Sequence, residues 1–148
     1  MDRIERAANL FTQGYNCSQS VAIAFSDLTG LDVESSAKLA SSFGAGMGCL
    51  REVCGAVSGM SMMASFLSPS PTNNDAEAKR RNYALVQNFA EEFRKMNGAI
   101  VCRTLLGLDC TKDEPTPSPR TAEYYKKRPC AELVGDAARI IAEYLLNH

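Results

Sequence analysis

Apolar side chains recur every three or four residues along most of the chain, and glycines, prolines or polar residues interrupt the pattern at intervals. Because one face of an α-helix repeats about every 3.6 residues, this spacing predicts amphipathic helices. Gly14, Gly30 and Gly98 fall where three of these stretches end, as glycines do in C-terminal caps. The predicted helices cover residues 2–13, 17–28, 33–43, 51–67, 75–97, 99–106 and the segment after Pro129.

Local signals place individual helix ends. Asn16 followed by Gln19 resembles a capping box at the start of the second helix, and Asp32 caps the third. Three glycines within residues 44–48 predict an irregular turn after that helix. The stretch 51–67 is apolar on all sides, which predicts a central, buried helix.

The remaining segments complete the prediction of the fold class. Two polar, proline-containing segments, residues 68–74 and 108–120, are predicted as loops. The short stretch 99–106 is predicted as a helix, although Ile100 and Val101 are also compatible with a strand. Because no long alternating pattern and no internal repeat occurs, we predict a single all-α domain. Residues 1–148 would form one helical bundle of about six to seven helices around a four-cysteine site.

The composition limits the class of protein. The chain has 148 residues, of which 45% are hydrophobic and 22% charged, as in an ordinary globular domain. Its net charge of −1 provides no basic field for binding nucleic acid. Residues 1–15 contain no secretion signal, and the longest weakly polar stretch, residues 54–67, is too short and too polar for membrane insertion. A cytoplasmic protein with no nucleic-acid or membrane partner is therefore expected.

The cysteines carry the candidate chemistry. The chain contains six, a lower density than in a small secreted disulfide scaffold, and disulfides are rare in a reducing compartment, so their number needs another explanation. Free N–H groups and the helix dipole stabilise a thiolate at a helix start by about 0.3 to 1 kcal/mol, which lowers the thiol pKa. This favours nucleophilic or metal-bound sulfur at the four cysteines that lie near predicted helix N-termini: Cys17, Cys54, Cys102 and Cys130.

Three basic residues lie close to the last of these four cysteines and are separated from it by Pro129: Lys126, Lys127 and Arg128. Their charge would favour the Cys130 thiolate further, but such a run of basic residues more often forms a solvated surface, and we prefer that interpretation. Cys49 and Cys110 are interpreted as small packing residues, because a free cysteine often behaves as a buried hydrophobe.

One motif resembles a known family. Residues 54–59 read Cys-Gly-Ala-Val-Ser-Gly, with Cys17 before the motif and Cys102 and Cys130 after it. In this order and spacing the chain resembles the C-GCAxxG-C-C family, whose members are described as redox-active. The resemblance implies a redox role for the four cysteines, while Cys49 and Cys110 lie outside the pattern.

The sequence leaves several functions open. In the first, the four motif cysteines ligate an iron–sulfur cluster and the protein transfers single electrons. In the second, the same cysteines are redox-active without a metal and cycle between dithiol and disulfide. A structural zinc site ranks third, and a helical interaction module with inert thiols is the remaining alternative.

Two further expectations accompany these readings. Gly55 and Gly59 lie one helical turn apart, and the missing side chains would let a neighbouring helix or a bound cofactor approach the backbone closely. A redox partner protein is expected for the electron-transfer and disulfide readings. An oxidoreductase activity is compatible with the chain, but the sequence does not decide whether it is an enzyme.

Overall fold

Helices account for nearly all regular structure in the computed structural model, which describes residues 2–109 and 112–148, without the side chain of Lys127. Six helices in this part of the chain have seven or more residues, which confirms the all-α prediction. The elements are α1 (Arg3–Thr12), α2 (Cys17–Ala24), α3 (Ser26–Thr29), α4 (Val33–Ala40), the 3₁₀ helix η1 (Ser41–Phe43), α5 (Gly44–Met47), α6 (Gly55–Leu67), α7 (Ala76–Asn97), α8 (Cys102–Leu105), α9 (Ala122–Lys127) and α10 (Cys130–Asn147).

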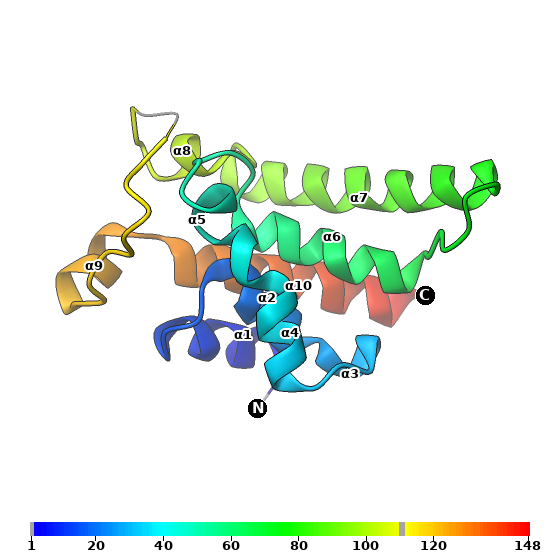
Figure 1. The fold of residues 1–148 in the computed structure, drawn as a ribbon, viewed down its shortest axis with the longest axis horizontal. Helices are drawn as coiled ribbons and strands as arrows, with labels where there is room; N and C mark the ends of the chain where they lie inside the picture. Colours follow the sequence, from blue (N-terminus) through cyan, green and yellow to red (C-terminus); the bar gives the residue numbers. More distant parts are fainter. Residues whose placement is uncertain (1, 110–111) are drawn as a thin grey trace.

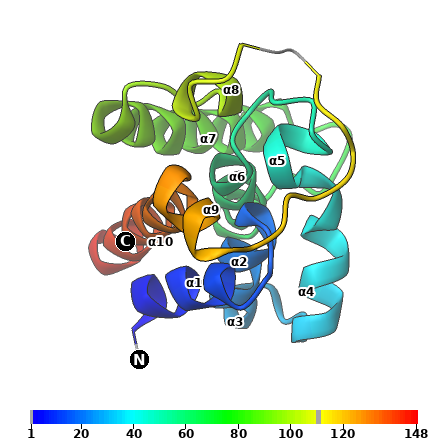
Figure 2. The same cartoon turned by 90° about the vertical axis from the view of Figure 1, so that its left-hand side faces the viewer.

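Three long helices, α6, α7 and α10, lie side by side and form the body of the molecule (Figure 1). Helix α10 packs against α1, α2, α6 and α7, and α2 packs against α6, so that α10 and α6 border most of the core. The starts of α6 and α10 lie at the same end of the bundle, together with the short helices α5, α8 and α9 (Figure 2). This end holds the site described below.

Side-chain caps explain where several helices begin. The predicted capping box is present: Asn16 accepts a hydrogen bond from the Gln19 N–H, and the Gln19 side chain accepts one from the Asn16 N–H. Such a cap satisfies backbone N–H groups that the helix itself leaves unpaired. Side-chain oxygens cap four further helices in the same position: Asp2, Asp32, Asp75 and Thr121.

The predicted helix over residues 51–67 is shorter than expected. Helix α6 begins only at Gly55, because Arg51 has left-handed backbone geometry and Val53 forms an isolated antiparallel bridge with Val101. The helix also has an outer face, where Phe66 is exposed, so the prediction of burial on all sides was wrong. Apolar composition therefore overstated the burial of this helix.

Other predicted boundaries also shift. The predicted second helix breaks at Phe25 into α2 and α3, although it still ends at Gly30 in left-handed conformation as expected. The stretch 99–106 has features of both the helix and the strand that its sequence allows. Val101 forms an isolated β-bridge with Val53, and the short helix α8 begins at the next residue. Helix α9 begins at the Thr121 cap and was not predicted. Residues 68–74 form no regular element, as expected, and the prediction for Cys110 lies outside the described residues.

Within the described residues, no helix is both long and apolar enough to cross a membrane.

A cavity lined by cysteines and arginines

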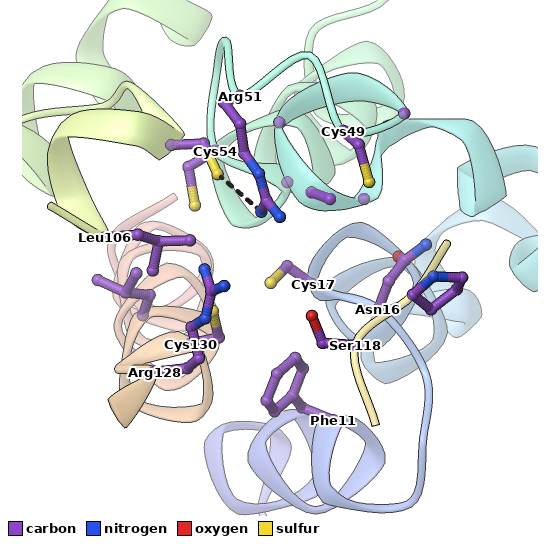
Figure 3. Close-up of a pocket in the computed structure, with 18 of the residues that line it drawn as sticks. Phe11, Asn16, Cys17, Cys49, Arg51, Cys54, Leu106, Ser118, Arg128 and Cys130 are labelled. Carbon is purple, nitrogen blue, oxygen red and sulfur yellow. Dashed lines mark hydrogen bonds between the residues drawn. The ribbon is translucent and has the colours of Figure 1, made fainter. Parts of the chain in front are cut away.

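The four motif cysteines line one cavity of about 310 Å³ at the end of the bundle (Figure 3). Cys17, Cys102 and Cys130 are the first residues of α2, α8 and α10, and Cys54 caps the start of α6. All four side chains are buried. Four segments that are distant in sequence therefore bring their thiols to a common space.

Cys17 and Cys130 both line this cavity, and each is the largest influence on the pKa of the other. Interaction with the Cys17 thiol, aided by the positive charges of Arg128, Arg120 and Arg51, holds the pKa of Cys130 below its usual value despite burial. The same interaction, together with burial, raises the pKa of Cys17 well above its usual range. The pair thus consists of a favoured thiolate at Cys130 and a neutral thiol at Cys17.

The other two motif cysteines are held in the neutral form. Burial raises the pKa of Cys54 to about 12, although the N–H groups of Ala56 and Val57 act in the opposite direction. Burial also raises the pKa of Cys102, against the charge of Arg51 beside it. The expectation that a helix start lowers the pKa of all four thiols was therefore wrong. Desolvation outweighs the helix-end field at Cys54 and Cys102, because that field supplies only about 0.3 to 1 kcal/mol, and at Cys17 the interaction with Cys130 outweighs it together with desolvation.

Arg51 brings a buried cation to the cavity. The residue is 8% exposed, and its Nη1 lies 3.7 Å from the sulfur of Cys102, the contact drawn as a dashed line in Figure 3. Its Nη2 lies 2.9 Å from Oδ2 of Asp113, a carboxylate whose side chain is 40% exposed. Its Nε is buried without a hydrogen-bond partner among the described residues.

A left-handed turn positions Arg51. Residues 45–49 all have positive φ, as does Arg51, and the turn is closed by bonds such as the one from the Glu52 N–H to the Gly46 carbonyl at 3.0 Å. A left-handed conformation costs roughly 1–2 kcal/mol for each residue with a side chain. A Cβ atom on Gly46 would lie 2.6 Å from Cα of Arg51 and 2.7 Å from Cβ of Cys102. The predicted irregular turn therefore serves to fit the chain between these residues.

The two motif glycines lie against helix α2. A Cβ atom on Gly55 would lie 3.1 Å from Cβ of Cys17, and one on Gly59 would lie 2.7 Å from Cβ of Val21. Gly55 also lines the cavity, whereas Gly59 faces Val21 and is absent from the cavity wall. The close approach of the neighbouring helix is thus seen at both glycines. Only Gly55 lies on the cavity wall, where a bound cofactor could contact it.

Two more arginines line the cavity, with different roles. Arg120 donates hydrogen bonds to the carbonyls of Phe11 at 2.9 Å and Tyr15 at 3.2 Å, and its guanidinium lies over the Phe11 ring. Arg128 lies over the ring of Tyr124, and within the described residues its side chain has no ion pair or hydrogen bond. Sequence reasoning named Arg128 but gave more weight to a solvated basic face.

Sequence reasoning missed Arg51, Arg120 and Asp113 altogether. Arg51 contacts Cys102 from 51 positions away in the chain, Asp113 contacts Arg51, and no local pattern marks any of the three residues. The remaining cysteine with a described position, Cys49, is half-buried on the cavity wall.

Metal-binding geometry is absent from the described residues. They contain no group of three or more His, Cys, Asp or Glu side chains arranged to hold a metal ion. The donor chemistry of four thiols suits iron or zinc, but their arrangement does not form a ready ligand set.

The fold and the cavity define a small all-α protein with a buried thiol site. The family model described as "Putative redox-active protein (C_GCAxxG_C_C)" matches residues 15–144 of this chain. The chain therefore belongs to this family, as the motif predicted, and a redox role follows from that membership. Neither a curated protein nor a solved structure gives a significant match.

Proposed function

We propose that the protein is a thiol–disulfide oxidoreductase whose redox pair is Cys17 and Cys130. The observation that carries the proposal is the placement of these two thiols on the wall of one cavity, where their interaction favours a thiolate at Cys130 and a neutral thiol at Cys17. Thiol–disulfide exchange needs a thiolate to attack and a second thiol near it to resolve the mixed disulfide. The family's redox role agrees with this chemistry.

The reaction would proceed in two steps. The Cys130 thiolate attacks one sulfur of a substrate disulfide, a bond forms between the two sulfurs, and the substrate S–S bond breaks. The leaving sulfur takes up the proton that Cys17 gives up. Cys17, now a thiolate, then attacks the sulfur of Cys130, which forms the Cys17–Cys130 disulfide and releases the second substrate sulfur as a thiolate that takes up a proton from water. Two electrons pass to the substrate, and a dithiol reductant returns the site to its reduced form.

Cys54 and Cys102 would play a supporting part in this scheme. Both are neutral thiols on the wall of the same cavity, and the raised pKa of each makes attack by either at neutral pH slower than attack by Cys130. They would shape the cavity and exclude water from the exchanging sulfurs.

An iron–sulfur cluster held by the four cysteines is the second candidate, because the four sulfurs line one cavity. Binding would require the side chains to shift, since the described residues present no ready set of three metal-binding side chains. A zinc site held by the same cysteines would need the same shift. We therefore rank both below the disulfide.

One experiment separates these candidates. The protein is purified without oxygen, its iron and zinc contents are measured, and it is then equilibrated with mixtures of oxidised and reduced dithiothreitol. We expect no stoichiometric metal, a loss of two free thiols on oxidation, and a Cys17–Cys130 crosslink in peptide mass spectra.

Matched variants complete the test. Cys49→Ser should still form the crosslink, whereas Cys17→Ser and Cys130→Ser should not. Stoichiometric iron that is lost in Cys130→Ser would replace the proposal by the cluster. An unchanged thiol count at every ratio of oxidised to reduced dithiothreitol would refute the disulfide.

A further inference from the structure

The cysteine cavity carries an excess of positive charge. Among the described residues, its wall includes Arg51, Arg120 and Arg128 but no aspartate or glutamate. Arg120 is committed to the carbonyls of Phe11 and Tyr15 and to stacking on aromatic rings. Arg51 and Arg128 therefore supply the cationic groups that remain for a ligand.

The guanidinium of Arg51 has a buried N–H group without a hydrogen-bond acceptor among the described residues, which points to a ligand. A buried guanidinium normally has hydrogen-bond acceptors for its N–H groups, because desolvating an unpaired cation is costly. The one described carboxylate that contacts it, Asp113, binds a single edge at 2.9 Å and is itself 40% exposed. The buried Nε has no acceptor among the described residues.

Arg128 complements this group from another wall. Arg128 lies two residues before Cys130, the first residue of α10. In Figure 3 its guanidinium projects into the cavity between Leu106 and Cys17. The positive charge of Arg128 is one of those that lower the pKa of Cys130. A negatively charged group bound between the two arginines would thus lie in the same cavity as the attacking sulfur.

We propose that this cavity selects small disulfides that carry a carboxylate, with the carboxylate bound by Arg51 and Arg128 and the disulfide presented to Cys130. Guanidinium groups bind carboxylates through paired, charge-assisted hydrogen bonds. A cavity of about 310 Å³ has room for a small molecule and not for a folded chain. This substrate class rests on the proposed function, whereas the anion site itself is independent of it.

The anion site is tested first with alkylating reagents. Reduced protein is treated with iodoacetate, which is anionic, or with iodoacetamide, which is neutral, and the Cys130 peptide is followed by mass spectrometry. Each reagent forms a sulfur–carbon bond and releases iodide. The ratio of the two rate constants cancels the thiolate fraction, so it reports attraction of the anion alone.

We expect the iodoacetate-to-iodoacetamide ratio to exceed that of a free small thiol in the same buffer and to fall as salt is added. Arg128→Gln should lower the ratio about ten-fold, as loss of one charge-assisted hydrogen bond does. Asp113→Asn should raise it, because it frees an edge of Arg51. Arg139→Gln, an exposed charge on α10 that does not line the cavity, is the matched control and should leave the ratio unchanged.

A wild-type ratio equal to that of the free thiol, or equal effects of Arg128→Gln and Arg139→Gln, would overturn the anion site. Substrate choice is tested with dithiodiglycolate, an anionic disulfide, against the neutral hydroxyethyl disulfide. We expect kcat/KM to favour the anionic compound, and Arg128→Gln to remove that preference. Equal reduction of both would overturn the substrate class and leave the oxidoreductase standing. Reduction of neither, with the alkylation preference intact, would overturn the oxidoreductase and the substrate class but leave the anion site standing.

Discussion

The thiols of Cys17, at the start of α2, and Cys130, at the start of α10, line the same cavity. The two residues are equivalent in local position, since each opens a helix, yet their pKa values move in opposite directions. The difference arises because the interaction of the two thiols favours the charged form at Cys130 and because the arginines stabilise that same sulfur. The pair is therefore asymmetric, and this asymmetry has measurable consequences.

Single substitutions in the pair should behave differently towards a disulfide substrate. Cys17→Ser should trap a mixed disulfide on Cys130, because the attacking thiolate remains and the resolving thiol is gone. Cys130→Ser should trap at least ten-fold less on Cys17 in the same time, because burial still raises the pKa of Cys17 and keeps it mostly in the neutral, unreactive form. Intact-protein mass spectrometry of the trapped adduct measures both. Equal trapping in the two variants would contradict the assigned roles.

Alkaline pH should destabilise the protein through its buried thiols. The pKa of Cys54 is raised by burial from its ordinary value of 9.0 to about 12, so its neutral form is favoured in the fold. A group with a raised pKa contributes its full stability below the unfolded pKa and loses it as pH rises. The free energy of unfolding should therefore fall between about pH 9 and pH 12, as measured by urea titration.

Cys54→Ala should make that fall shallower by a few kcal/mol across the interval, since about 1.4 kcal/mol corresponds to each pKa unit. Cys49→Ala, which also removes a cysteine, serves as the control for the loss of one thiol. A wild-type stability that stays flat to pH 12 would argue against a desolvated Cys54.

Helix α6 approaches α2 closely at Gly59. Gly59→Ala should lower the free energy of unfolding by about 1–3 kcal/mol, because the added Cβ would overlap the side chain of Val21. The cost of Gly59→Ala should be smaller in a Val21→Gly background, because that change removes the Cβ of residue 21 that the new methyl group would meet. Thermal and urea unfolding measure both.

A matched glycine gives the opposite sign. Gly135→Ala places its Cβ 3.8 Å from Cγ2 of Ile4, an ordinary contact, within helix α10. It should stabilise the protein by about 0.5–1 kcal/mol through better helix propensity. Destabilisation of similar size by both glycine substitutions would show that contact with Val21 is not the cause.

The left-handed turn should be intolerant of a side chain at Gly46. In Gly46→Ala the added Cβ would clash with the backbone of Arg51, and the alanine would also pay the conformational cost of a positive φ. Gly48→Ala has a positive φ but its nearest contact is the Ser42 carbonyl at 3.8 Å, so it should cost only the conformational term of about 1–2 kcal/mol. Urea unfolding should therefore rank Gly46→Ala as clearly the more damaging change. Equal losses would indicate that the turn adapts around position 46.

Local chemistry in the sequence determined much of the fold. The helical spacing of apolar residues predicted the all-α class, and caps such as Asn16 and Asp32 marked helix starts that the structure retains. These signals act over one or two turns, so they can be read without knowing which segments meet. The same local reading placed the motif cysteines at helix starts.

Tertiary structure alone decided what those cysteines do. Whether a thiol is ionised depends on its burial and on charges nearby in space, and both are set by packing. Arg51 reaches the cavity through a left-handed turn that no periodicity predicts, and it faces Cys102 from another part of the chain. The sequence therefore determined the helices and the candidate sulfurs, whereas packing determined that Cys130 is the favoured thiolate and Cys17 a neutral thiol beside it, because desolvation and charge act through space and not along the chain.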